Sequence, residues 1–145
     1  MTKPVVVFAI GNPSRGDDAL APTLVEVLKV NGLPEQVELI DDFQLQIEHT
    51  LDLKNRSLIL FVDACMSCCE PFQFNKAIAS VDPSFGAHEL SPSGLLEVYQ
   101  QTNKKNITNA YVLAIKGYQF DLGSPLSTKA KNNLDQALKL CDQLM

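Results

Sequence analysis

The sequence predicts an α/β fold in which a mostly parallel, five-stranded twisted sheet has helices on both faces and an antiparallel strand at one edge. Runs of β-branched and apolar residues at 5–10, 57–62 and 110–115 are typical of strands buried on both faces of a parallel sheet. Segments with helical spacing alternate with these runs, as strand–helix–strand crossovers require. The length of 145 residues suits one domain, residues 1–145, and 46% hydrophobic residues are enough for a packed core.

The first half of the chain is expected to supply three strands and two helices. After the first strand, Leu20, Leu24 and Leu28 recur on one helical face, and Asn31-Gly32 is a typical helix end. Apolar content and turn residues delimit the rest of this half. The expected elements are a strand at 5–10, a helix at 19–30, a strand at 37–40, a short helix at 44–53 and a strand at 57–62.

The second half begins with a weaker strand whose mixed polarity favours an edge position. Ser91-Pro92 indicates a helix start, because serine caps the first turn and proline fits the first helical position. Ala130, Leu134 and Ala137 form the apolar stripe of the last helix. The expected elements are a strand at 74–80, a helix at 92–101, a strand at 110–115 and a helix at 127–144.

Composition excludes several classes of function. The net charge is −5 and no dense run of Lys or Arg occurs, which argues against a nucleic-acid partner. No segment approaches the roughly 20 apolar residues of a membrane span, and no signal peptide is evident, so a cytoplasmic protein is expected. Cys65, Cys68 and Cys69 lie within five positions, a spacing that indicates free, reduced thiols better than a disulfide framework.

Three chemically active side chains are expected at one edge of the sheet. The loop from Gly11 to Asp18 follows the first strand, Asp63 stands at the end of the third, and His88 lies in the loop after the fourth. Open α/β sheets bind ligands beyond the carboxyl ends of their strands. Two carboxylates and an imidazole suit a divalent transition metal. Asp17 or Asp18 can also cap the following helix, since a carboxylate accepts the free N–H groups of its first turn.

Several ordered motifs span nearly the whole chain: Gly11-Asn12-x-x-x-Gly16-Asp17-Asp18-Ala19, Gln44-Leu45, Val62-Asp63-Ala64, His88 before Ser91-Pro92, and Gly117-x-x-x-x-Leu122-Gly123-x-x-Leu126-Ser127. Together they resemble the endopeptidases that mature [NiFe]-hydrogenases. Two departures from the family pattern are Ala21, where glycine is frequent, and Pro71-Phe72, where Pro-Gly is frequent. Neither falls on a proposed ligand.

The resemblance implies an aspartyl-type endopeptidase that removes the C-terminal extension of a [NiFe]-hydrogenase large-subunit precursor once nickel has been inserted. It implies nickel supplied by the substrate, no organic cofactor, and the precursor as partner. Asp18, Asp63 and His88 match the residues that sense nickel, and are the expected metal ligands and catalytic groups. Whether nickel assists cleavage or only positions the tail is left open. The expected supporting residues are Gly11, Asn12 and Asp17.

Two other functions use the same residues. A receiver-like phosphoacceptor domain would bind Mg²⁺ with Asp63 and with the acidic pair, Asp17 and Asp18. It would also need Ser80 and Lys116 as partners. The six-residue loop before the acidic pair argues against it, and His88 would have no role. A non-catalytic nickel chaperone or sensor is the second alternative, to which the cysteine cluster gives some support. His49, on the short second helix, is expected to be a surface or packing residue.

Overall fold

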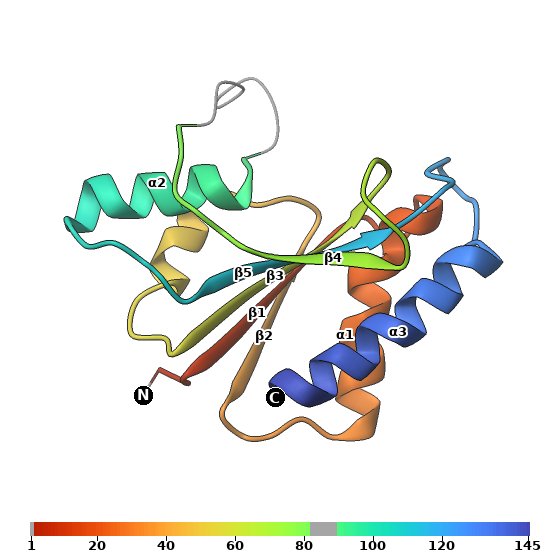
Figure 1. The fold of residues 1–145 in the computed structure, drawn as a ribbon, viewed down its shortest axis with the longest axis horizontal. Coiled ribbons are helices and arrows are strands. Elements are labelled where there is room, and N and C mark those ends of the chain that lie inside the picture. Colours follow the sequence, from red (N-terminus) through yellow and green to blue (C-terminus); the bar gives the residue numbers. More distant parts are fainter. Residues whose placement is uncertain (1, 82–89) are drawn as a thin grey trace.

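A computed structural model describes residues 2–81 and 90–145 and shows one sheet with helices on both of its faces (Figure 1). The 3₁₀ turns are η1 (Gly16–Ala19) and η2 (Ile47–Asp52). The helices are α1 (Leu20–Asn31), α2 (Pro92–Asn103) and α3 (Thr128–Leu144). The strands are β1 (Val5–Ile10), β2 (Val37–Asp42), β3 (Leu58–Cys65), β4 (Phe72–Lys76) and β5 (Ala110–Lys116).

The five strands are arranged in the order β2-β1-β3-β5-β4. The β1–β2, β1–β3 and β3–β5 pairs are parallel, and β4 joins the edge antiparallel to β5. The predicted fold class is therefore confirmed, including the antiparallel edge strand. Ile10 at the end of β1 pairs with Asp42 of β2 and with Asp63 of β3, so the ends of these three strands are level.

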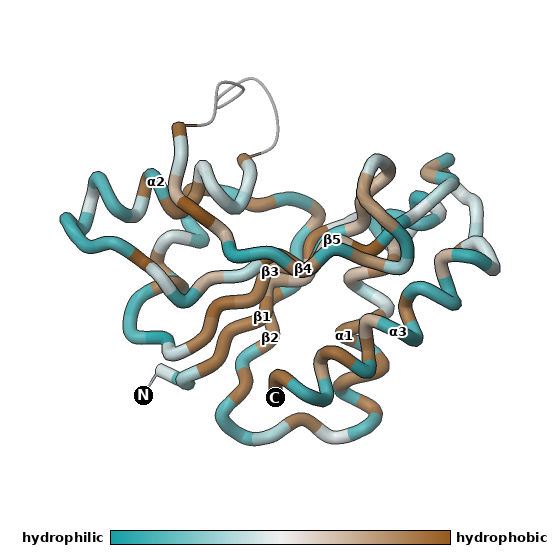
Figure 2. Tube along the Cα trace, in the orientation of Figure 1, coloured by the Kyte–Doolittle hydropathy of each residue, from teal (hydrophilic) through white to brown (hydrophobic). Residues whose placement is uncertain are grey.

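The sheet is buried on both faces, as the continuous apolar runs predict. Val7 and Ala9 face the layer formed by α1 and α3, whereas Val6 and Phe8 face the layer formed by α2 and η2. In Figure 2 the central strands are the most hydrophobic part of the tube, and the helices alternate between hydrophobic and hydrophilic residues. Among the described residues, no helix is both long and apolar enough to cross a membrane.

Several elements differ from their sequence-based limits, among them β2, which ends at Asp42 rather than at residue 40. β3 continues to Cys65, so Asp63 lies inside a strand, where pairing with Ala114 of β5 extends the ladder. β4 ends at Lys76 rather than at residue 80. Residues 44–53 form only the 3₁₀ turn η2, because the buried His49 accepts the Gln46 N–H through Nδ1 at 2.8 Å and closes a tight cap. His49 is thus a packing residue, as expected.

Candidate functional site

The topological switch point of the sheet lies at the carboxyl ends of β1 and β3, where the strand order reverses. From β1 the chain crosses through α1 to β2 on one side, then reaches β3 on the other side of β1. Such a switch point leaves a crevice at the strand ends. The β1–α1 loop starts here, and η1, which carries Asp17 and Asp18, contacts β3. The two expected acidic positions therefore arise from neighbouring elements.

Asp18 is partly exposed and is held by its own loop. Its Oδ2 accepts the backbone N–H of Asn12 at 2.7 Å. Asn12 Oδ1 in turn accepts the backbone N–H of Ser14 at 2.9 Å, which fixes the turn. No other hydrogen bond to the Asp18 carboxylate comes from residues 2–81 or 90–145, so Oδ1 is available to a ligand. The loop therefore orients Oδ2 of Asp18 through a hydrogen bond, whereas Oδ1 accepts none from the described residues.

Gly11 allows the chain to fold back over the Asp18 backbone. A Cβ at position 11 would lie 2.1 Å from the carbonyl oxygen of Asp18 and 3.3 Å from Cδ of Pro22. No side chain fits at such distances without a backbone shift. The loop therefore requires glycine at its first position in order to place Asp18.

Replacing Gly11 with alanine is expected to destabilise the protein by about 2–4 kcal/mol, because the new methyl group must push away the Asp18 carbonyl. Gly32→Ala is the matched control: Gly32 has a φ of +85° but open space around its Cβ position, so only about 1 kcal/mol of backbone strain is expected. Urea unfolding of both variants measures the difference. Equal losses would show that contact with Asp18 is not the reason for glycine.

Asp17 does not cap a helix, in contrast to the expectation from sequence. Its side chain forms no cap to η1 or α1. It is fully buried and points instead to the segment after β5. Asp17 Oδ1 accepts the Ser127 N–H at 2.7 Å, and Oδ2 accepts the N–H groups of Tyr118 at 2.7 Å and Gln119 at 3.1 Å and the Ser127 hydroxyl at 2.8 Å. It therefore attaches the β1–α1 loop to the start of α3.

The hydrogen bonds to Asp17 determine its ionisation. Burial acts to raise the pKa of this carboxyl, but the bonds from Ser127, Tyr118 and Gln119 together hold the pKa below its usual value. Asp17 is therefore a carboxylate whose charge is satisfied internally. It has no oxygen left for a metal, whereas its neighbour Asp18 does.

Asp63 lies on the face of the sheet covered by α2. Its Oδ1 accepts the backbone N–H of Ala64 at 2.8 Å. The side chain borders a cavity of about 330 Å³ between the strand ends and the start of α2. The cavity is lined by Ile10, Leu45, Phe61, Asp63, Ala64, Cys65, Leu90, Ser91, Pro92, Val112 and Ala114.

His88, the third expected ligand, lies outside the described residues. Leu90, two positions later in the sequence, lines the same cavity as Asp63. Within residues 2–81 and 90–145, no group of three or more His, Cys, Asp or Glu side chains is arranged to hold a metal ion. The ligand set Asp18, Asp63 and His88 thus stays a prediction.

Several solved structures of hydrogenase maturation proteases have the same fold as this chain. The [NiFe] hydrogenase maturation protease HycI from Thermococcus kodakarensis KOD1 is 19% identical, with 97% of this chain and 91% of that chain aligned at a TM-score of 0.72. The hydrogenase maturating endopeptidase HybD from E. coli is also 19% identical, covering 94% and 88% at 0.73. The chain has the fold of the hydrogenase maturation proteases.

A third structure agrees with this assignment. The hydrogenase 2 maturation peptidase from Thaumarchaeota archaeon SCGC_AB-539-E09 is 20% identical and covers 97% of this chain and 96% of that one, with a TM-score of 0.67. No protein-family model and no curated protein matches the sequence. The fold expected from the motif resemblance is confirmed.

The maturation-protease fold disagrees with a receiver-like domain. Doubly wound receiver sheets have the strand order 2-1-3-4-5, whereas here β5 lies next to β3 and β4 is an antiparallel edge strand. Lys116, the lysine that a receiver would need, donates from Nζ to the Met66 carbonyl. Both observations speak against the phosphoacceptor alternative.

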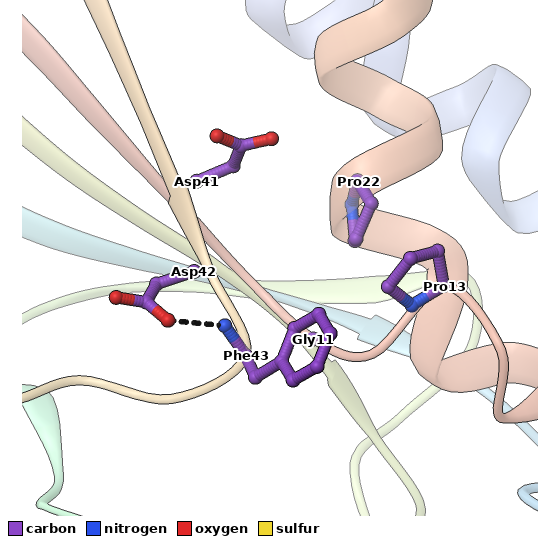
Figure 3. Close-up of a pocket in the computed structure, with 6 residues that line it drawn as sticks. All are labelled: Gly11, Pro13, Pro22, Asp41, Asp42 and Phe43. Atoms are coloured by element: carbon purple, nitrogen blue, oxygen red, sulfur yellow. Dashed lines mark hydrogen bonds between the residues drawn. The ribbon is translucent and has the colours of Figure 1, made fainter.

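A second pocket, which the sequence did not predict, lies beside the β1–α1 loop (Figure 3). It has a volume of about 230 Å³. Gly11, Pro13 and Pro22 of the β1–α1 segment form one side, and Asp41, Asp42 and Phe43 at the end of β2 form the other. The sequence did contain a signal, since two aspartates directly follow the short strand expected at 37–40.

The cysteine cluster begins at the last residue of β3. Burial acts to raise the pKa of the Cys65 thiol, but hydrogen bonds with Cys68 and Ser67 hold that pKa below its usual value. Burial and the hydrogen bond to Cys65 raise the pKa of Cys68 to about 12. All four cysteines, including Cys69 and Cys141, are free thiols, as the sequence predicts.

Proposed function

We propose that this chain is an endopeptidase that removes the C-terminal extension of a [NiFe]-hydrogenase large-subunit precursor carrying nickel. Asp18 and Asp63 bind the nickel ion that the precursor presents, and His88 completes the set. Nickel is part of the substrate, so the peptidase cleaves only precursors into which the metal has been inserted. The enzyme acts in the cytoplasm, a reducing compartment in which proteins with free cysteines are common.

The observation that supports this function best is the position of the two carboxylates in a fold shared with hydrogenase maturation proteases. Asp18 follows β1, Asp63 of β3 pairs with Ile10 at the end of β1, and the two strands are adjacent at the switch point. Carboxylate oxygens are suitable ligands for a divalent transition metal. The uncommitted Oδ1 of Asp18 fits a ligand supplied from outside.

The same residues define the roles of their neighbours. Gly11 and Asn12 place the Asp18 carboxylate, and Asp17 anchors the loop to α3. The cavity beside Asp63 has the volume to admit several side chains of an extended tail. Nickel bound there would act as a Lewis acid on the scissile carbonyl or would orient it. Asp18 and Asp63, as anions, draw the cation-bearing end of the precursor to this edge.

Incubating the purified chain with a nickel-loaded precursor tests whether it is a peptidase. We expect mass spectrometry to detect two products, the shortened large subunit and the released tail peptide. A precursor whose mass stays constant at stoichiometric enzyme would contradict the proposal. Tight binding of free nickel without any cleavage would favour the chaperone or sensor instead.

A further inference from the structure

The cysteine cluster beside Asp63 has no role in the proposed cleavage, although it lies at the site. Cys65 is the last residue of β3, two positions after Asp63, and lines the same cavity. Cys68 is a buried residue of the loop that follows β3, and Cys69 in the same loop is exposed. A thiol at the cavity wall, with a second thiol three positions further on, therefore needs an explanation of its own.

The two thiols are held near one another by defined contacts. The Cys68 thiol donates to the carbonyl oxygen of Cys65 at 3.5 Å and to that of Ala114 at 3.8 Å. The Cys65 sulfur lies 3.9 Å from the hydroxyl oxygen of Ser67, in the turn between the two thiols. Cys69 points elsewhere, since its sulfur accepts from Gln73 Nε2 at 3.9 Å. Cys65 and Cys68 thus form a pair from which Cys69 is excluded.

The loop that carries the pair is fastened at both ends. Lys116 Nζ donates to the Met66 carbonyl, and the Tyr118 hydroxyl donates to Glu70. Asn133 Nδ2 of α3 holds the Tyr118 oxygen at 2.9 Å. These contacts attach the loop at Met66 and Glu70 to the end of β5 and to the residue two positions after it.

We propose that Cys65 and Cys68 are a reversible thiol–disulfide pair that peroxides oxidise, and that the disulfide slows cleavage. The partly exposed sulfur of Cys65 attacks one peroxide oxygen, the O–O bond breaks, and one water leaves with the thiol proton. Cys68 then attacks the sulfenic sulfur of Cys65, and a second water leaves as the S–S bond forms. Two thiols lose two electrons in total, which the peroxide accepts. A dithiol reductant reverses the step.

Oxidation and metal binding make different demands on such a cluster. A structural zinc site needs about four N or S ligands in a tetrahedron, and among the described residues no three potential ligands gather here. A disulfide needs only two thiols. The arrangement therefore suits a redox pair better than a metal site.

The effect on cleavage follows from the position of Cys65 and depends on the proposed function. In the reduced state its side chain forms part of the wall of the Asp63 cavity. A bond to Cys68 draws the sulfur from that wall toward the β5 side, where Cys68 contacts Ala114. The cavity wall next to Asp63 is thereby changed, and the precursor tail is held less well.

The covalent step is tested on the full chain without any substrate. Treatment with hydrogen peroxide is expected to remove the mass of two hydrogen atoms, with peptide mapping placing the bond between Cys65 and Cys68 and dithiothreitol restoring the thiols. The matched control Cys69→Ser should behave like the wild type, whereas Cys65→Ser and Cys68→Ser should each lose the linkage. A bond that involves Cys69, or one between two chains, would overturn the proposal.

The functional consequence is tested separately with nickel-loaded precursor. We expect the oxidised chain to cleave at least about tenfold more slowly than the reduced chain, and Cys68→Ser to keep its rate after peroxide. If the disulfide forms and the rate is unchanged, regulation is refuted while the peptidase proposal stands. If neither form cleaves the precursor, the proposed function fails, and the mapped disulfide still decides whether the pair exists.

Discussion

Replacing Asp63 with asparagine is expected to reduce cleavage of a nickel-loaded precursor by about 100-fold or more. Asparagine keeps the shape of the side chain, and its oxygen can still accept the Ala64 N–H that Asp63 accepts at 2.8 Å. The change removes the negative charge at the cavity next to Ile10. The rate of tail release, measured by mass spectrometry, should therefore fall while the fold is kept.

Two measurements separate this loss from a general effect. Asp121→Asn removes one charge from an exposed position in the loop after β5, and its rate should match the wild type. The midpoint temperature of thermal unfolding of Asp63→Asn should be close to that of the wild-type protein. Cleavage at the wild-type rate by Asp63→Asn would exclude Asp63 as a metal ligand or catalytic group.

Replacing Asp17 with asparagine is expected to lower the free energy of unfolding by about 2–4 kcal/mol. The fully buried carboxylate accepts hydrogen bonds from three backbone N–H groups and the Ser127 hydroxyl. In asparagine an NH₂ group, which is itself a hydrogen-bond donor, would replace one of the accepting oxygens and would face these buried N–H and O–H donors. Asp135→Asn on the exposed side of α3 is the control and should change stability by less than about 0.5 kcal/mol.

The same carboxylate determines how stability depends on acidity. Because the pKa of Asp17 is lowered in the folded state, its contribution is fully present above the ordinary aspartate pKa of about 3.9 and is lost as pH falls through the lower folded value. Urea unfolding from pH 6 down to pH 2 should therefore show a shallower acid decline in Asp17→Asn than in the wild type. Parallel curves would show that Asp17 does not carry this effect.

Sequence reasoning succeeds here where the signal is local. The apolar runs predict β1, β3 and β5, and Ser91 caps α2 by accepting the Gly94 N–H at 3.0 Å, as the Ser-Pro pair indicates. The strand-end rule predicts Asp63 near the carboxyl ends of the strands, and in the structure Asp63 pairs with Ile10, the last residue of β1. These features depend on residue type and spacing within a few positions.

The features that sequence reasoning missed depend on long-range contacts. Aspartate just before a helix is typical of a helix cap, but the hydrogen-bond partners of Asp17, Tyr118 and Ser127, lie 101 and 110 positions away. The need for glycine at position 11 comes from the chain folding back onto the carbonyl of Asp18. The pocket at Phe43 lies between the end of β2 and the loop that follows β1, two segments brought together by the pairing of Ile10 with Asp42. Such contacts become visible only once the fold is known.

In the proposed function, Asp18 and Asp63 recognise nickel carried by the precursor. The most direct measurement compares tail release from nickel-loaded and nickel-free precursor at the same enzyme concentration. We expect release from the nickel-loaded form at least about 100-fold faster, and expect Asp18→Asn to remove most of that difference. Equal rates on the two precursors, or a nickel preference that survives in Asp18→Asn and Asp63→Asn, would contradict the account.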